Sequence, residues 1–198
     1  MKYKYITIER EYGSGGTQIA RRLADECGLP CYGQEILEAV AKKHNISIDS
    51  IQKYEENVIN SFLYTTYVLS RIQSGNTDLL AREGHLFVAE QNEIKELAAN
   101  GPAIFLGHCA SEALKEYKVL KVFIRCSDGE VKLNRILTDY GIAKDDAEKV
   151  RKQYDNKRAK YFYANTTQKW DELKNYDIIL DSASLGTDGC VAALKGLI

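Results

Sequence analysis

Glycines near the N-terminus predict a loop that could bind phosphate. The loop consists of Gly13, Ser14, Gly15, Gly16 and Thr17. A β-branched and aromatic run at 5–8 precedes it, and apolar residues recur at helical spacing behind it. In such a strand–loop–helix unit, backbone N–H groups can face an anion at the helix N-terminus, where the helix dipole also favours negative charge. The alternative is a glycine turn that only lets the strand and the helix pack.

The loop departs from the P-loop pattern at two positions. The pattern G-x-x-x-x-G-K-[ST], laid over 10–17, keeps its second glycine as Gly15 and its hydroxyl as Thr17. Arg10 stands in place of the first glycine, and Gly16 stands in place of the lysine. Arg10 is the nearest cation that could replace the lysine, although an arginine at a strand end is more often a surface or salt-bridge residue. The sequence therefore predicts a degenerate phosphate loop.

A second set of charged residues has the spacing of one helix face. Arg151, Asp155 and Arg158 are separated by four and three residues, which places their side chains on one stripe of a helix. The two guanidinium groups could clamp phosphate oxygens, while the carboxylate orients them or accepts a sugar hydroxyl. The alternative is a solvent-facing ladder of salt bridges, each contributing about 0.2–0.5 kcal/mol.

Composition limits the classes of protein that need to be considered. The chain has 198 residues and a net charge of −1, whereas a general nucleic-acid binder normally has a strong basic excess. Apolar runs stay well short of the roughly 18 residues of a membrane span, and the N-terminus runs into a strand rather than a signal peptide. We expect a cytoplasmic protein that binds neither membranes nor nucleic-acid polymers. Its five scattered cysteines are expected to be reduced thiols.

Strands and helices are expected to alternate along the chain. Such alternation predicts βαβ units and a parallel sheet in an α/β fold, with ligands at the carboxyl ends of the strands. We expect one domain, 1–198, with helical insertions. The expected strands cover 5–8, 31–32, 103–106, 119–124 and 176–180. The expected helices include one ending at 28–30, a helical region at 34–75, one at about 78–100 and a last one after 187.

Four segments together resemble the cytidylate-kinase-like family, a branch of the P-loop nucleoside monophosphate kinases. They are the opening Ile-Glu-Arg-Glu-Tyr-Gly-Ser-Gly-Gly, the stretch 101–110, the spacing Arg151-x-x-x-Asp155-x-x-Arg158 and the closing stretch 176–186. The resemblance implies a three-layer α/β/α P-loop NTPase fold with a five-stranded parallel sheet. It also implies that 34–75 forms the acceptor side and that 139–146 forms a mobile lid.

The resemblance carries roles over to the two motifs. Gly13 to Thr17 would hold the β-phosphate of ATP, with the Thr17 hydroxyl on Mg²⁺. Arg151 and Arg158 would stabilise the charge of the transition state, and Asp155 would accept from the acceptor ribose. Phosphoryl transfer depends on positioning and cations rather than covalent chemistry, so such a set is sufficient in kind.

Two or three cations of the true cytidylate kinases are missing from this chain, whose residues 31–35 also lack the acceptor-site Ser and Arg of those enzymes. Gly16 replaces the P-loop lysine, a loss shared by the branch, and His108 replaces the arginine that usually follows the glycine of the third strand. His108 could bind the acceptor phosphate when protonated, but an ordinary histidine pKa of about 6.5 leaves it mostly neutral at pH 7. A hydrogen-bonded residue at a strand end is the alternative. Losing one transition-state donor can cost about 10²–10³ in rate.

These observations leave two hypotheses open. The first is an ATP-dependent phosphotransferase that acts on a nucleoside monophosphate, CMP or dCMP according to the resemblance, or a kinase for another small acceptor. The second is a catalytically weak or inactive nucleotide-binding protein of the same fold. Tyr64, Tyr67 and other apolar residues of the middle helices could form either an acceptor pocket or the interface of a homo-oligomer.

Overall fold

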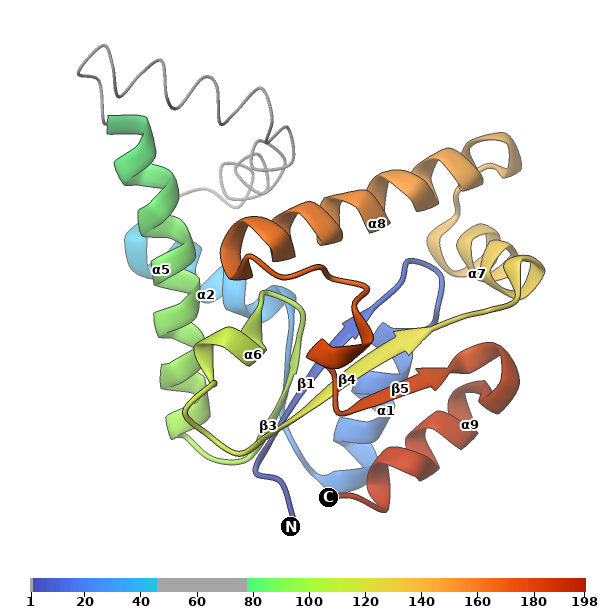
Figure 1. Cartoon of the computed structure of the whole chain (residues 1–198), viewed down its shortest axis with the longest axis horizontal. Helices are drawn as coiled ribbons and strands as arrows, with labels where there is room; N and C mark the ends of the chain where they lie inside the picture. The colour runs from blue at the N-terminus through green and yellow to red at the C-terminus, as the bar shows by residue number, and fades with distance from the viewer. Residues whose placement is uncertain (1, 46–77) are drawn as a thin grey trace.

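A five-stranded parallel sheet forms the centre of the molecule, as the sequence predicts (Figure 1). The computed structural model describes residues 2–45 and 78–198, except for the side chains of 78–86. The strands lie in the order β2-β3-β1-β4-β5 and all pair in parallel. Their bounds are β1 Tyr5–Arg10, β2 Cys31–Tyr32, β3 Ala103–Leu106, β4 Val119–Arg125 and β5 Ile178–Asp181.

The central strand β1 is longer than the apolar run that predicts it. Its pairing with β4 continues past the apolar run, with Glu9 opposite Phe123 and Arg10 opposite Ile124. The charged Arg10 therefore stands at the carboxyl end of the central strand. At the sheet edge, β5 begins at Ile178, two residues later than expected.

Helices cover both faces of the sheet, which gives the three-layer α/β/α arrangement (Figure 1). The helices α1 and α9 pack on one face and α2, α5 and α6 on the other. The helix bounds are α1 Gly16–Cys27, α2 Gln34–His44, α5 Asp78–Ala99, α6 Ala110–Ala113, α7 Gly129–Tyr140, α8 Lys144–Thr166 and α9 Ser182–Lys195, with a 3-10 turn at Leu173–Asn175.

The inner strands β1 and β3 are buried on both faces because both faces carry apolar side chains, whereas the edge strand β5 is only partly buried. In β1, Ile6 and Ile8 join the core under α1 and α9, while Tyr5 joins the core under α5 and α6. Every residue of β3 is buried. The continuous apolar runs of the sequence follow from this two-sided burial.

Three of the expected helices can be compared with the structure. The first ends at Gly28, as expected, and α5 matches the helix expected at 78–100. Of the helical region 34–75, the described part is α2, and the remainder, with Tyr64 and Tyr67, lies outside the described residues. The helix predicted after 187 corresponds to the second part of α9, and the structure adds a turn before it that begins at Ser182. Asp181 caps an early turn, and Gly186, with φ +64°, interrupts it before the helix resumes.

A helical hairpin, α7 and α8, follows β4 at the carboxyl edge of the sheet (Figure 1). The expected lid, 139–146, corresponds to the end of α7, the link between the helices and the start of α8. The hairpin packs Ile136 and Ala147 against Tyr12 of the glycine loop. The mobility of this lid stays a prediction, as does the single-domain organisation. None of the helices in the described part of the chain has the length and apolar character needed to cross a membrane.

Candidate functional site

The loop between β1 and α1 has the backbone of a phosphate cradle. Gly13 and Gly15 have φ values of +76° and +74°, in the left-handed region that glycine adopts without steric cost. Gly15 is the N-cap of α1; it makes no side-chain cap hydrogen bond, and the first turn carries no acidic residue. The Gly16 N–H donates to Ser14 Oγ at 3.3 Å, whereas the next N–H groups of the first turn, those of Thr17 and Gln18, have no such partner among the described residues and can face an anionic ligand.

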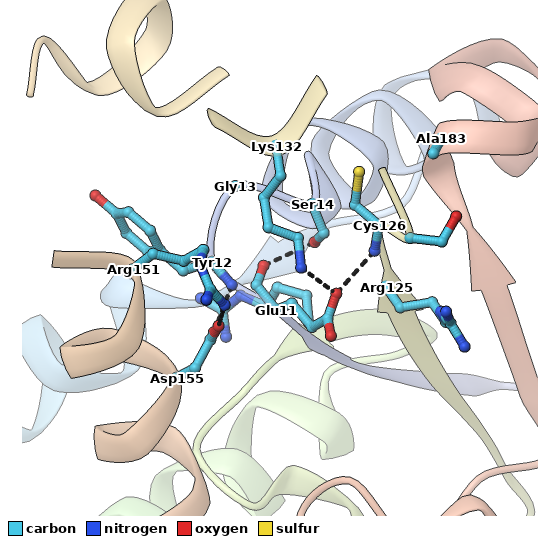
Figure 2. A network of polar contacts seen from close by, with 12 residues as sticks. Glu11, Tyr12, Gly13, Ser14, Arg125, Cys126, Lys132, Arg151, Asp155 and Ala183 are labelled. Carbon is cyan, nitrogen blue, oxygen red and sulfur yellow. Dashed lines mark hydrogen bonds and ion pairs between the residues drawn. The ribbon is translucent and has the colours of Figure 1, made fainter. Parts of the chain in front are cut away.

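A carboxylate beside the loop holds its shape (Figure 2). Glu11 Oε2 accepts hydrogen bonds from the backbone N–H of Cys126 and from Lys132 Nζ, each at 2.8 Å. The Ser14 hydroxyl donates to the Glu11 carbonyl oxygen at 2.8 Å. These bonds connect the loop to the end of β4 and to α7.

The loop residue Tyr12 connects the cradle to both helices of the hairpin. Its backbone N–H donates to Asp155 Oδ1 at 2.7 Å (Figure 2). Its ring stacks on Tyr154 of α8 and on Tyr140 of α7. Burial raises the pKa of Asp155 above its ordinary value, although the Tyr12 N–H and Arg158 act in the opposite direction.

The outer side of the loop is covered by α7 and by the start of α9. A Cβ added to Gly13 would lie 2.8 Å from Lys132 Cγ, so α7 touches the loop backbone directly. Arg135 Nη1 donates to the Ser14 carbonyl and to Ser182 Oγ, both at 3.0 Å. The Ser182 hydroxyl donates to the same Ser14 carbonyl at 2.6 Å. The Ser14 carbonyl oxygen of the cradle is thus already hydrogen-bonded within the protein.

A pocket of about 530 Å³ lies beside the cradle, at the carboxyl ends of β1 and β3. This is the position at which open α/β sheets bind ligands. In the described part of the chain, its charged lining consists of four cations, Arg10, Arg21, Lys157 and Arg158, and one carboxylate, Glu9. The other lining residues are Thr17, Gly33, Gln34, Leu37, Leu106, Gly107, His108, Cys109, Tyr154, Tyr161 and Phe162.

The arginine motif lies on one face of α8, as its spacing predicts. Arg158 lines the pocket, and its Nη1 donates to the Arg10 carbonyl at 2.9 Å. Asp155 Oδ1 lies 3.9 Å from Arg158 Nη1, and Asp155 Oδ2 lies 3.5 Å from Arg151 Nη1. Arg151 makes two hydrogen bonds with Glu148, at 2.8 and 2.7 Å. The structure therefore places Arg158 in the pocket wall and leaves Arg151 and Asp155 outside the lining residues.

Arg10 carries a charge in the pocket wall that no described carboxylate pairs with directly, although Glu9 in the same lining acts to raise its pKa. Burial and the nearby Arg158 lower the pKa of Arg10 to about 10, which still leaves it protonated at neutral pH. Among the described residues, no carboxylate lies within ion-pair distance of Arg10, and its buried Nε has no hydrogen-bond partner. Two neighbouring guanidinium groups, Arg10 and Arg158, therefore form a site suited to an anion.

His108 lies at the end of β3 in an unusual backbone segment. Gly107, His108 and Cys109 all have positive φ, at +79°, +56° and +50°. The His108 Nδ1 is 3.7 Å from Oε2 of the fully buried Glu90. The Tyr161 hydroxyl donates to that same carboxylate oxygen at 2.5 Å. The structure thus brings His108 to the pocket together with a buried acid that the sequence analysis does not single out.

Comparison with known proteins identifies the family. A model described as the cytidylate kinase-like family matches residues 5–184. The chain belongs to this family. Membership supports a nucleotide-binding phosphotransferase of the P-loop kinase fold. A comparison with curated proteins found no significant match.

Solved structures similar to this cytidylate kinase-like protein agree with the fold. An uncharacterized protein from Eubacterium ventriosum is 22% identical, with a TM-score of 0.71 and coverage of 98% of this chain and 97% of that one. Shikimate kinase from Bacteroides thetaiotaomicron is 14% identical, with a TM-score of 0.52 over 98% and 96%. The protein TT1252 from Thermus thermophilus is 13% identical, with a TM-score of 0.55 over 98% and 95%. At these sequence identities, the similarity shows a shared fold and carries no conclusion about substrates.

The cytidylate kinase-like site fits Mg²⁺ only if phosphate supplies most of the ligands. In the described part of the chain, no three His, Cys, Asp or Glu side chains gather to hold a metal. Thr17 in the first turn of α1 lines the pocket, so its hydroxyl can supply one oxygen ligand. Mg²⁺ commonly takes its other ligands from substrate phosphates and water.

Several residues of the site were not predicted from the sequence, among them Arg21 of the pocket lining. Lys157 lines the pocket, Glu90 lies behind it, and Glu11, Lys132 and Arg135 hold the cradle. The sequence carries one usable signal: Lys132 and Arg135 are three residues apart on a helix and thus share a face. Lys157 and Glu90 are single charges without a motif, whereas Glu11 stands in the opening motif, which does not by itself show that Glu11 holds the loop.

Proposed function

We propose that this protein transfers the γ-phosphoryl group of ATP, in the presence of Mg²⁺, to a nucleoside monophosphate such as CMP or dCMP. Family membership supports the phosphotransferase class. The choice of a cytidine acceptor rests on the family resemblance of the sequence motifs.

One observation carries the proposal. A single pocket brings together the first turn of α1 and cations from separate parts of the chain, through Thr17, Arg10 and Arg158. Among the described lining residues four cations stand against one carboxylate, although Arg21 is engaged by Glu35 at 2.6 Å, so this part of the pocket favours a ligand with several negative charges. A donor triphosphate at the helix N-terminus and an acceptor phosphate beside it would match this distribution.

The proposed roles follow the motifs. The loop from Gly13 to Thr17 would hold the β-phosphate, with Thr17 as a ligand of Mg²⁺. Arg158 and Arg151 would neutralise charge on the transferring phosphoryl group, Arg151 after release from Glu148. Asp155 would keep its bond to the Tyr12 N–H through Oδ1 and accept from the acceptor ribose through Oδ2. The catalytic contribution of these groups is electrostatic.

Acceptor binding is assigned to the end of β3. His108 lines the pocket near Glu90, whose buried carboxylate can serve as the counter-charge of an imidazolium. His108 would bind the acceptor phosphate in this form. The acceptor side is also expected to include residues of 46–77, outside the described part of the chain.

A nucleotide-binding protein with weak or absent transferase activity is the second candidate. The observation that favours it is the absence of two cations of the kinase pattern, where Gly16 and His108 stand instead of the lysine and the arginine. A kinase for another small acceptor is a variant of the first candidate, since the positive pocket selects for anionic charge rather than for a base. The net charge of −1 supports the proposal that nucleic-acid polymers are not partners. A cytoplasmic location and a homo-oligomer stay predictions.

The test uses purified protein with ATP, Mg²⁺ and a panel of nucleoside monophosphates, and measures ADP formation for each acceptor. Arg158→Ala is the diagnostic variant and is expected to lower kcat by about 10²–10³. Lys149→Ala is the matched control, because Lys149 is an exposed cation on the same helix and is not among the pocket-lining residues.

The outcomes separate the candidates. Turnover with one acceptor that is lost in Arg158→Ala and kept in Lys149→Ala supports the kinase. ATP binding in a calorimeter without turnover for any acceptor supports the nucleotide-binding protein. Unchanged turnover in Arg158→Ala would contradict the catalytic role of Arg158.

A further inference from the structure

The two departures from the P-loop pattern are in contact with each other. The pattern expects glycine at position 10 and lysine at position 16, and this chain has Arg10 and Gly16. A Cβ added to Gly16 would lie 2.5 Å from Arg10 Cβ and 2.9 Å from Arg10 Cγ. Real Cβ atoms do not approach so closely. The stem of Arg10 therefore occupies the space that any side chain at position 16 would need.

Backbone strain does not account for the glycine at this position. Gly16 is the first residue of α1 and has no positive φ, in contrast to Gly13 and Gly15. A residue with a side chain could adopt this backbone. Contact with the side chain at position 10 is thus the main physical reason for glycine at position 16, with a smaller contribution from Ile124, whose Cβ lies 3.3 Å away.

The head of Arg10 lies over a second glycine. A Cβ added to Gly107 would lie 2.7 Å from Arg10 Nη1. Arg10 thus extends from Gly16, at the start of α1, to Gly107, at the end of β3, and it lines the pocket between them. The Arg10 carbonyl is held in place by Arg158 Nη1 at 2.9 Å. The cation therefore enters the pocket from the central strand rather than from the phosphate loop.

We propose that Arg10 takes over the function of the missing P-loop lysine, and that positions 10 and 16 have exchanged the glycine and the cation of the pattern. This inference rests on the proposed function. During transfer, a bond forms between an acceptor oxygen and the γ-phosphorus while the bond to the β,γ-bridging oxygen breaks, and the electron pair leaves with ADP. Arg10 neutralises charge on the phosphoryl oxygens and exchanges no proton.

The exchange predicts the behaviour of a set of variants. Arg10→Gly removes the cation and should weaken binding of inorganic tripolyphosphate by about tenfold or more. The same variant should lower kcat by about 10²–10³. Gly16→Lys alone should be as defective, because its side chain meets Arg10. The double variant Arg10→Gly/Gly16→Lys satisfies the whole pattern over 10–17 and should recover most of the binding and part of kcat.

Two further variants serve as controls. Arg10→Lys keeps a cation on a stem from position 10 and should lose less than Arg10→Gly. Arg125→Gly removes a half-exposed arginine from the end of the neighbouring strand β4, where it pairs with Asp181 at 3.6 Å. Arg125→Gly should leave tripolyphosphate affinity unchanged.

The measurements are tripolyphosphate binding by calorimetry, phosphoryl transfer, and thermal unfolding of each variant. Recovery in the double variant supports the exchange. Wild-type affinity in Arg10→Gly overturns it. A double variant that unfolds at the wild-type temperature but binds tripolyphosphate no better than Arg10→Gly also overturns the exchange. The binding measurements need no acceptor, so a wild-type protein without transferase activity would contradict the proposed function and still leave the exchange tested.

Discussion

Tyr12 of the phosphate loop and Tyr154 of α8 stack face to face, with ring centroids 4.5 Å apart and 11° between the ring planes. Tyr140, at the end of α7, stacks on Tyr12 as well, at 4.8 Å. The Tyr12 ring thereby joins both helices of the hairpin to the loop. If this hairpin moves, it must either break the ring contacts with Tyr12 or move the loop with it.

Removing the Tyr12 ring should destabilise the protein and loosen the loop. Tyr12 is buried among apolar side chains of α7 and α8, so Tyr12→Ala leaves a cavity and should lower the free energy of unfolding by about 3 kcal/mol. Tyr12→Phe keeps the ring and should change the free energy of unfolding by less than about 0.5 kcal/mol. Urea unfolding measures both. Equal stability of the two variants would show that the stack contributes nothing.

Asp155 should give the folded protein a specific pH dependence. Burial raises its pKa in the folded state above its ordinary value, so the folded state keeps the proton to higher pH than the unfolded state. Between these two pKa values the unfolded state binds fewer protons, and stability falls as the pH rises. This loss is complete above the folded pKa.

Asp155→Asn isolates this effect, because the amide oxygen can still accept from the Tyr12 N–H. The stability of the wild-type protein minus that of Asp155→Asn should decrease as the pH is raised from about 4 to 7. Urea unfolding of both proteins across this range gives the difference, in which the other titrating groups cancel. A difference that increases with pH would mean that the pKa of Asp155 is lowered instead.

The buried acid behind the pocket should depend on Tyr161. Glu90 is 0% exposed and accepts the Tyr161 hydroxyl at 2.5 Å, so Tyr161→Phe leaves a carboxylate oxygen buried with one donor fewer. We expect Tyr161→Phe to lower the free energy of unfolding by about 1–3 kcal/mol. Tyr163→Phe is the matched control, because Tyr163 on the same helix is 59% exposed and should tolerate the change within about 0.5 kcal/mol. Equal effects in the two variants would contradict a structural role of the Tyr161 hydroxyl.

Local patterns predicted the sheet and the positions of both motifs. The apolar run 103–106 becomes β3 with the same bounds, and the spacing of Arg151, Asp155 and Arg158 places them on one face of α8. The start of α9 was missed because Gly186 interrupts the helix, so the periodic apolar pattern begins only after it. Strand and helix periods are properties of neighbouring residues, and they are readable without the fold.

Side-chain partners within the site were less predictable. The i, i+4 spacing allows Arg151 to face Asp155, but it does not show that Glu148 holds Arg151 with two hydrogen bonds. It also does not show that Asp155 accepts from the Tyr12 N–H, a bond across 143 residues of sequence. The packing of α8 against the loop decides which of these groups reaches the pocket.

By itself, the sequence determined that this chain has a glycine loop after a buried strand, a helix with Arg151 and Arg158 on one face, and a parallel sheet. Each of these features depends on residues that are close together in the chain. Only the tertiary structure decided that Arg10 and Gly16 share one space, that Gly107 leaves room for the guanidinium, and that Glu90 lies behind His108. Those relations join segments that meet only when the sheet is assembled and the helices pack on it.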